Sequence, residues 1–348
     1  KLQKLGGSTI WIEAIIALTL YLTPIILVYA GLVTSVWMSL GLGLVMGTGF
    51  LMVGADIMHS ANHGTFSSNK KINKFFSYSM ELLGMSSRNW KVQHNDLHHM
   101  HTNIVGEGGD GDLATGEPIL KYSLFSKLTG GLYKHQHKYV WFLYSLAFVM
   151  WITNKDFRML PIYYKEGRYR FRKGQEMTKG ALYRELIFNK LLYYSFFFII
   201  PIAVLGTPFY IIFVMWLTSA MLAGAIMMPV FQMAHTVDKI HQYDERAIDV
   251  SWMNHQIRTS ADVRLSNPAT HWIFTHLVGG LNYQKVHHVF RGISHTHYPA
   301  LSKIVNDLVA KHNIESHTFT SLRSAIASHY RMMRIIGSSK GEGSVHLH

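Results

Sequence analysis

The chain contains four long apolar runs, which fall into two pairs. Residues 10–33 and 36–57 form the first pair, and residues 187–205 and 209–229 form the second, with only a few residues between the members of each pair. A helix needs about 20 apolar residues to cross a hydrocarbon layer about 30 Å thick. The pattern therefore predicts four transmembrane helices arranged as two tight hairpins.

The second of these runs is rich in glycine. Small residues let transmembrane helices approach each other closely. We therefore expect this helix to pack tightly against its neighbours through Gly41, Gly43, Gly47, Gly49 and Gly54.

A shorter apolar stretch covers residues 139–152, which is too short to span a bilayer. It contains Trp141 and Trp151, and Lys138 and Lys155 flank it. Aromatic and basic residues at such positions are typical of helices in the plane of the membrane interface. We expect this stretch to lie there.

Basic residues are segregated along the chain. Residues 5–69 and 191–238 contain no Lys or Arg, although the chain has 33 of them. This segregation is typical of a membrane protein and predicts that both termini and the long connection after the second run are cytoplasmic. Cytoplasmic loops and anionic lipid headgroups then explain the formal net charge of +13 better than nucleic acid does.

These patterns predict an all-α membrane protein with a single integral-membrane domain over residues 1–348. The hairpins at 10–57 and 187–229 cross the membrane, and 58–186 and 230–335 form a helical cytoplasmic cap domain. The Gly/Ser-rich end, 336–348, is expected to be disordered. Residue 1 is not Met and no cleavable signal pattern is visible, which is consistent with a trimmed N-terminus.

The chain contains no cysteine. This excludes disulfides, iron–sulfur clusters bound by the chain and zinc fingers of the cysteine-bearing kinds. Any metal must bind to nitrogen and oxygen ligands.

The candidate chemistry lies in histidine clusters, of which the densest covers residues 90–103. There His94 and His98 are four residues apart, and His99 follows. On an α-helix, residues i and i+4 share a face, which predicts that the His94 and His98 rings stack and that His99 turns to the side. Neutral imidazole is a common metal ligand, so the pair indicates part of a metal site.

Two further clusters and one single histidine stand at comparable places. His59 and His63 directly follow the second apolar run, and His235 directly follows the fourth. His287 and His288 lie in the cytoplasmic C-terminal part, after Gln284. Because the hairpin topology brings the ends of these runs to one membrane face, we expect the clusters to converge on one metal centre.

These motifs resemble the three histidine boxes of the membrane fatty acid desaturases. The boxes are His-Ser-Ala-Asn-His at 59–63, His-Asn-Asp-Leu-His-His at 94–99 with Thr-Asn at 102–103, and Asn-Tyr-Gln-Lys-Val-His-His at 282–288. The run His-Thr-His-Tyr-Pro at 295–299 resembles the segment after the third box in that family, and the similarity covers roughly residues 50–305. Gln284, in place of the first histidine of the third box, resembles the front-end branch, which inserts double bonds between an existing one and the carboxyl end.

The resemblance implies a di-iron centre held by imidazoles. Its implied direct ligands are His59, His63, His94, His98, His99, His235, His287 and His288. Ligating histidines usually donate their other N–H to an acceptor, and the candidates for such supporting roles are Gln284, Asp56, Asp96, Asp110, Asp112 and Asn103. Possible additional ligands are His101, His295 and His297. No catalytic residue beyond the metal centre is expected, and the remaining histidines that we take as ordinary surface or capping residues include His135, His137, His241, His255, His312, His317 and His329.

The activity that the resemblance implies is an O2-dependent insertion of a cis double bond into a fatty acyl chain, at a delta-5- or delta-6-like position of an acyl lipid or acyl-CoA. Two iron ions would be the cofactor, and zinc would replace them where expression loads the wrong metal. The cofactor carries the difficult step, and the protein sets which carbon lies beside it.

The electrons are expected to come from a separate protein. The sequence Gly-Glu-Gly-Gly-Asp-Gly at 106–111 matches the dinucleotide pattern, but it follows no predicted strand and its acidic residues would repel a pyrophosphate. A His-Pro-Gly-Gly signature of a fused b-type cytochrome is also absent from the sequence. We therefore expect a ferredoxin or a free b-type cytochrome to dock on the basic run at 165–173, unless this run binds anionic lipid. The absence of that signature favours a bacterial inner membrane over the endoplasmic reticulum.

Two alternatives stay open at this point. One is a membrane di-iron hydroxylase of lipid, alkane or carotenoid, which shares the boxes in outline. The other is a non-enzymatic metal carrier, which should have histidines or carboxylates along a path at mid-membrane depth. The four apolar runs contain no histidine, which disfavours the carrier.

Overall fold

The computed structural model of the chain describes residues 5–105, 109–112, 119–171, 173–244 and 251–341. The chain divides into two compact units. We call residues 7–92 and 144–226 the hairpin unit, and residues 1–6, 93–143 and 227–348 the histidine unit.

The hairpin unit is helical throughout its regular structure among the described residues. Its elements are α1 (Gly7–Tyr29), α2 (Val36–Met52), the π-helix η1 (Val53–Met58), α3 (His59–Asn62), α4 (Lys70–Ser77), α5 (Ser79–Leu82), α6 (Ser87–Trp90), the π-helix η5 (Trp151–Lys155), α8 (Asp156–Lys165), α9 (Lys179–Tyr194) and the π-helix η6 (Ser195–Val204), with parts of α7 (Gln136–Met150) and α10 (Phe209–His235).

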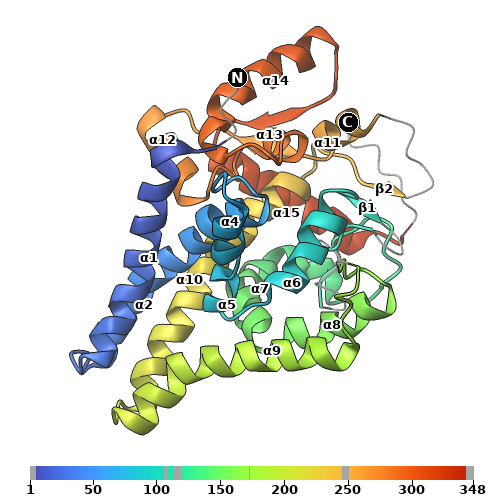
Figure 1. Cartoon of the computed structure of the whole chain (residues 1–348). Coiled ribbons are helices and arrows are strands. Elements are labelled where there is room, and N and C mark those ends of the chain that lie inside the picture. The colour runs from blue at the N-terminus through green and yellow to red at the C-terminus, as the bar shows by residue number, and fades with distance from the viewer. Residues whose placement is uncertain (1–4, 106–108, 113–118, 172, 245–250, 342–348) are drawn as a thin grey trace. The chain divides into compact units, whose positions relative to one another are not determined.

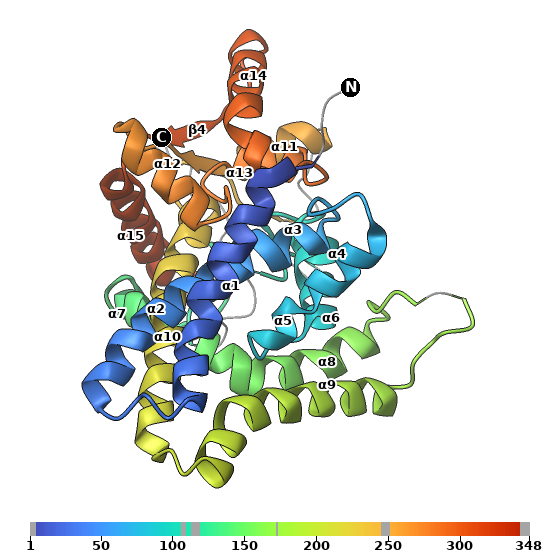
Figure 2. The same ribbon diagram turned by 60° about the vertical axis from the view of Figure 1, so that its left-hand side comes forward.

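Within the described part of the chain, four helices are long and apolar enough to cross a membrane, as predicted. They are Gly7–Tyr29, Val36–Asn62, Lys179–Val204 and Phe209–His235. Figure 1 shows α1 and α2 side by side, joined at one end by a short loop. In Figure 2, α8 and α9 also lie alongside each other.

The ends of these helices differ from the predicted ones in a consistent way. The third begins at Lys179 instead of residue 187, because its first turns are helical but carry Arg184 and Glu185, which an apolar pattern excludes. The second continues to Asn62 and the fourth to His235. His59 and His235, which were expected just after these helices, are therefore within them, and His63 caps the second helix.

Three of the five predicted glycines, Gly43, Gly47 and Gly49, allow the expected close packing, whereas Gly41 has no neighbour within 4 Å and Gly54 has only ordinary contact with Leu83 at 3.7 Å. A Cβ atom added at Gly43 would lie 2.8 Å from the carbonyl oxygen of Met215 in α10, and one at Gly47 would lie 2.9 Å from that of Ser219. A Cβ atom at Gly49 would collide with the backbone of Tyr21 in α1. Atoms do not pack at these separations, so side chains larger than hydrogen would push the helices apart.

The stretch predicted to lie in the membrane interface forms α7 and continues into η5. Its buried residues recur every fourth position, at Val140, Tyr144, Phe148 and Ile152, whereas Phe142 is 60% exposed. The helix thus buries one stripe and exposes apolar residues elsewhere. Its place in the membrane interface stays a prediction.

The histidine unit adds short strands to a mainly helical chain. Its elements are the π-helix η2 (Lys91–His98), β1 (Ile104–Val105), the 3₁₀-helix η4 (Tyr133–His135), β2 (Tyr243–Asp244), α11 (Trp252–Arg258), β3 (Ala261–Val263), α12 (Pro268–Leu277), α13 (Gln284–Val289), the 3₁₀-helix η7 (His295–His297), α14 (Tyr298–Lys311), β4 (His317–Phe319) and α15 (Leu322–Ser338), with parts of α7 and α10. The strands pair in parallel, β1 with β2 (Ile104 opposite Tyr243) and β3 with β4 (Ala261 opposite His317).

A small apolar core fixes the helix of the third histidine box. Val286 of α13 is fully buried against Ile257 of α11 and against Tyr298, Leu301 and Val305 of α14. Because α13 is only two turns long, this packing and not helix propensity holds its histidines in place.

The predicted disordered tail begins too early. α15 continues to Ser338, and Met332, Met333 and Ile336 are buried on its inner face. Burial of these apolar side chains keeps residues 336–338 helical. The Gly/Ser content of the sequence led to the wrong prediction of disorder there. Residues 342–348 lie outside the described residues.

Candidate metal centre

The second histidine box lies on a π-helix, and this changes which rings meet. In η2 the N–H of His99 donates to the carbonyl of His94, five residues earlier. The rings of His94 and His98 stack as predicted, with centroids 5.3 Å apart. However, His99 does not turn aside, because the wider turn brings its Nε2 to 3.1 Å from the Nε2 of His94.

Two aspartates hold the Nδ1 sides of this box. Nδ1 of His98 donates to Asp110, at 2.9 and 3.1 Å from its two oxygens, and Nδ1 of His94 donates to Asp112 at 2.8 Å. Burial lowers the pKa of His94 despite Asp112, whereas Asp110 outweighs burial and holds the pKa of His98 above its ordinary value. Each carboxylate thus fixes the tautomer of its ring and leaves Nε2 facing inward.

His235 and His288 have the same arrangement with uncharged acceptors. Nδ1 of His235 donates to the carbonyl of Thr259 at 3.0 Å, and Nδ1 of His288 donates to Oε1 of Gln256 at 2.9 Å. A neutral imidazole that donates through Nδ1 has a lone pair at Nε2. The two Nε2 atoms are 3.2 Å apart, so two lone pairs face each other.

His98 completes a triangle with these two rings. The centroids are 4.8 Å apart for His98 and His235, 4.9 Å for His98 and His288, and 4.8 Å for His235 and His288. One ligand atom from each ring lies within 4.8 Å of the others, and all three residues are buried. Nε2 of His98 is buried with no hydrogen-bond partner among the described residues. Three converging lone pairs without a donor between them fit a bound cation, and the nitrogen donor set suits a transition metal.

A second histidine group surrounds His99 in the same unit. The ring of His287 lies 4.6 Å from that of His99 and stacks at 5.9 Å on that of His94. Nδ1 of His287 is hydrogen-bonded to the hydroxyl of Tyr298 at 3.1 Å. The histidine unit therefore brings together six of the eight predicted ligands.

The first histidine box lies in the hairpin unit. His59 begins α3, directly after η1, and His63 caps the same short helix. Their ring centroids are 4.6 Å apart, and both rings lie edge-on to Trp90, at 5.9 and 6.1 Å. The two imidazoles are thus paired, and Asp56, one turn before, is fully buried in η1.

The remaining predicted supporting residues occupy different environments. Asn103 has a left-handed backbone (φ 55°), donates its N–H to Asp110, and donates its amide to the carbonyl of His235 at 2.8 Å. Both amide atoms of Gln284 are buried with no hydrogen-bond partner among the described residues, which suits a side chain that faces a ligand. Asp96 is half-buried in η2.

The three possible additional ligands, His101, His295 and His297, also lie in different surroundings. His101 is half-buried, and its Nδ1 has no hydrogen-bond partner within the described part of the chain. His295 is buried in η7. Nε2 of His297 donates to the carbonyl of Leu5 at 2.9 Å, so this nitrogen is not available to a metal.

Several residues that hydrogen-bond to the histidines of the site were not predicted from the sequence. Gln256 accepts from His288 and from the hydroxyl of Thr102, and thereby joins the second and third boxes. Gln256 and Thr259 lie in no motif, so nothing in the sequence marked them. Tyr298 belongs to the run after the third box, and that resemblance was the available signal.

Three histidines taken as surface or capping residues are buried, namely His137, His255 and His329. Nε2 of His255 donates to the carbonyl of Thr102 at 2.8 Å, and Nδ1 of His329 donates to that of Thr236 at 2.6 Å. These last two satisfy carbonyls inside the unit, a structural role that an isolated histidine in a sequence does not reveal.

The glycine-rich sequence at 106–111 also needs correction. The sequence predicted no strand before it, but in the structure the two-residue strand β1 directly precedes it. Residues 106–108 lie outside the described residues. Asp110, at the end of this sequence, and Asp112, just after it, hold His98 and His94, so the acidic loop supports the histidines.

Among the described residues, four membrane-length helices and a buried group of converging imidazoles indicate an integral membrane protein with a candidate metal centre rich in histidine. Comparison with known proteins gives the family. The fatty acid desaturase family model matches residues 35–320.

Named relatives agree with this match. An sn-1 linoleoyl-lipid 6-desaturase of Synechocystis sp. is 30% identical over 288 residues, which cover 82% of this chain and 76% of that protein. A protein of the same name from Arthrospira platensis is 30% identical over 307 residues, or 86% and 78% of the two chains. An acyl-lipid (8-3)-desaturase of Physcomitrium patens is 28% identical over 87% of this chain and 62% of its own length.

The chain therefore belongs to the fatty acid desaturase family and is an oxidoreductase. The family and the histidine clusters together indicate a di-metal site.

Proposed function

We propose that this desaturase uses O2 to insert a cis double bond into a lipid-bound fatty acyl chain, between an existing double bond and the carboxyl end. The observation that carries the chemistry is the group of three Nε2 lone pairs of His98, His235 and His288. The names of the relatives support a lipid-bound chain over acyl-CoA. Gln284 in the third box supports the front-end position.

The proposed cofactor is two iron ions. The proposed ligands are His59, His63, His94, His98, His99, His235, His287 and His288. His98, His235 and His288 form one three-nitrogen group, and the other five are assigned from their motifs. When bound, the iron pair supplies the reduction of O2 and the oxidant that removes hydrogen from an unactivated methylene.

The chain's own residues set the conditions for that chemistry. Asp110, Asp112 and Gln256 keep protons on the Nδ1 atoms, so that Nε2 stays a ligand atom. Seven of the eight proposed ligands are buried and His63 is partly buried, which keeps bulk water from the reacting carbons. One turnover consumes O2, two electrons and two protons, removes two hydrogens from neighbouring carbons, and yields the alkene and two waters.

We infer an external electron donor, a ferredoxin or a free b-type cytochrome. Lys165, Arg170 and Lys173 form a basic exposed stretch that suits an acidic protein; Arg172 lies outside the described residues. Replacement of Lys165 and Lys173 by Glu should raise the KM for the donor severalfold without changing metal content, and Lys303→Glu, on α14, is the matched control. An unchanged KM would assign the stretch to lipid.

The proposed location is a bacterial inner membrane, with both termini and the active site cytoplasmic. The segregation of basic residues supports this orientation. Single cysteines introduced near each terminus and labelled in intact and permeabilised cells test it, because the chain has no cysteine of its own.

Product analysis tests the proposed activity. The protein is expressed in a host without polyunsaturated lipids, defined fatty acids are fed, and new double bonds are located by mass spectrometry. A cis double bond on the carboxyl side of an existing one is expected. His98→Ala should abolish it while membrane insertion stays intact, and a hydroxylated product without a new alkene would favour the hydroxylase instead.

A further inference from the structure

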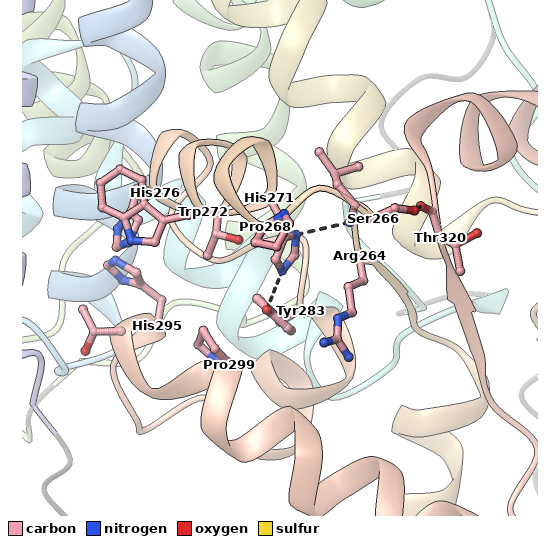
Figure 3. A pocket seen from close by; sticks show the side chains of 13 residues that line it. Arg264, Ser266, Pro268, His271, Trp272, His276, Tyr283, His295, Pro299 and Thr320 are labelled. Atoms are coloured by element: carbon pink, nitrogen blue, oxygen red, sulfur yellow. Dashed lines mark hydrogen bonds between the residues drawn. The ribbon is translucent and has the colours of Figure 1, made fainter.

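A cavity in the histidine unit lies outside the metal centre and offers chemistry of its own. Its volume is about 670 Å³, and it is formed by the β3–α12 connection, α12, the start of α13 and the η7–α14 turn. Figure 3 shows Arg264 at one side, His271 and Tyr283 in the middle, and Trp272, His276 and His295 at the other side. Its lining residues include one arginine and three histidines but no aspartate or glutamate.

The tautomer of His271 directs a hydroxyl donor of this cavity. Nδ1 of His271 accepts from the N–H of Leu265 at 3.2 Å, so it carries no hydrogen. Nε2 must then be the protonated nitrogen, and it donates to the hydroxyl oxygen of Tyr283 at 2.7 Å. The O–H of Tyr283 is therefore left to donate to a ligand. Figure 3 shows both hydrogen bonds.

Arg264 supplies a positive charge at one side of the cavity. Its backbone N–H is bonded to the carbonyl of Phe319, which fixes the residue, while its side chain is exposed. Within the described residues its guanidinium makes no ion pair with a carboxylate. Burial and the charge of Arg264 lower the pKa of His271, which agrees with its neutral tautomer. A fork of N–H donors beside a phenol O–H fits a tetrahedral oxyanion.

The rim of the cavity carries exposed apolar side chains. Trp272 and Ile273 of α12 are 63% and 58% exposed, and the Trp272 ring lies 4.4 Å from that of His276. Exposed tryptophan and isoleucine on a short helix are typical of residues that enter the headgroup region of a bilayer. This rim suits a ligand that combines an oxyanion with an apolar part.

The cavity is also joined to the metal centre through the chain. Tyr283 directly precedes α13, which carries His287 and His288. On the other wall, His295 lies three residues before Tyr298, whose hydroxyl is bonded to His287. A ligand held here would have a fixed position relative to the third histidine box.

We propose that this cavity binds the phosphate of a phospholipid headgroup through Arg264 and Tyr283, and that this lipid carries the acyl chain to be desaturated. The second part of this inference rests on the proposed function; the first part does not. The proposed ligand is a lipid phosphate. Inorganic phosphate is tested separately, because it offers the same oxyanion without the lipid.

Binding is tested on the purified full-length protein in detergent. Dihexanoyl-phosphatidylglycerol, dihexanoylglycerol and inorganic phosphate are titrated while the fluorescence of Trp272 is followed, with Trp272→Phe to identify its signal. We expect the phospholipid to bind at least 10-fold tighter than the other two. Arg264→Ala should weaken it at least 10-fold, Arg264→Lys should restore part of the loss, and Tyr283→Phe should weaken it less; Arg323→Ala, an exposed arginine of α15, should bind normally.

Two results would overturn the lipid phosphate site. One is equal binding of dihexanoylglycerol and the phospholipid, and the other is tight binding of inorganic phosphate alone. An unchanged melting temperature of Arg264→Ala ensures that lost binding is not lost folding.

A turnover measurement separates this inference from the proposed function. With a phospholipid substrate, Arg264→Ala should raise KM about 10-fold while metal content and the double-bond position stay the same. If the wild-type protein desaturates the lipid and Arg264→Ala does so with an unchanged KM, the cavity does not hold the substrate. If the wild-type protein forms no double bond in any lipid, the proposed function fails, and the binding result still decides whether the cavity binds a phosphate.

Discussion

Carboxylates decide which nitrogen of each histidine in the second box can bind a metal. Asp110 accepts from Nδ1 of His98 and also from the backbone N–H groups of Asn103 and Asp112. A single carboxylate therefore fixes both the ring and the loop that supplies the neighbouring carboxylate. Groups of this kind orient ligands and raise their basicity without touching the metal.

Asp110→Asn should weaken metal binding about 10- to 100-fold, because the amide is uncharged and turns one N–H toward donors. Metal content after competition with a graded chelator measures this. Asp307→Asn, an exposed residue of α14, serves as control. Wild-type affinity in Asp110→Asn would mean that the carboxylate does not orient a ligand.

Glu81 makes stability depend on pH in the hairpin unit. Burial raises its pKa to about 7, against the hydrogen bonds that it accepts from the N–H and hydroxyl of Ser87. Because the folded pKa lies above the ordinary value of 4.5, the folded state binds the proton more tightly, and the stabilisation present below pH 4.5 is lost as pH rises through 7. Melting temperature in detergent should therefore fall by a few degrees between pH 5 and pH 8 from this group.

Glu81→Gln should remove this part of the pH dependence, because the amide still accepts from Ser87 and does not titrate. The comparison is the slope of melting temperature against pH in the two proteins. Equal slopes would show that Glu81 is ionised in the folded state throughout.

The residues that could be predicted at this scale are those with a motif. Asp110 and Asp112 were accessible to prediction because acidic residues follow the second box closely. Gln256 and Thr259 were not, since their contacts with His288 and His235 depend on how distant segments fold.

At the scale of elements, the spacing of hydrophobic and polar residues could not predict that η2 is a π-helix. Spacing of four residues predicts a shared face in an α-helix, and His94 and His98 do share one. The additional contact of His99 arises from the wider hydrogen-bonding turn. A sequence periodicity does not distinguish the two kinds of turn over eight residues.

The packing of α2 on α1 leads to a matched pair of substitutions. Gly49→Ala adds a methyl group where the backbone of Tyr21 already lies, whereas Gly41→Ala adds it where nothing lies within 4 Å. We expect Gly49→Ala to cost about 1–3 kcal/mol, the usual range for overpacking, and Gly41→Ala to cost nothing. Melting temperatures in detergent compare them. Equal melting temperatures would mean that α1 and α2 do not pack at this distance.

For the whole molecule, hydropathy predicted the four membrane helices and charge-free loops predicted their pairing. It misplaced their ends where polar turns continue a helix, as at Lys179, or where the ligands themselves are helical, as at His59 and His235. It also missed the helical end of α15, because burial of Ile336 and its neighbours depends on tertiary packing. Patterns within a segment were thus readable, and contacts between segments were not.

Metal binding should stabilise the whole protein, because the proposed ligands come from segments that are far apart in the sequence. His98, His235 and His288 come from three separate elements, and without a cation the Nε2 lone pairs of His235 and His288 face each other at 3.2 Å. A metal that binds only the folded state adds about 2.7 kcal/mol at a free concentration 100 times its Kd. Iron added to metal-free protein should therefore raise the melting temperature by several degrees, and a chelator should reverse this. His98→Ala and His288→Ala should melt lower and lose most of the response, because each leaves two of three nitrogens, whereas His312→Ala, an exposed histidine after α14, should respond like the wild type. A wild-type melting temperature that iron does not change, or a full response in His98→Ala, would contradict a metal held by this triangle of imidazoles.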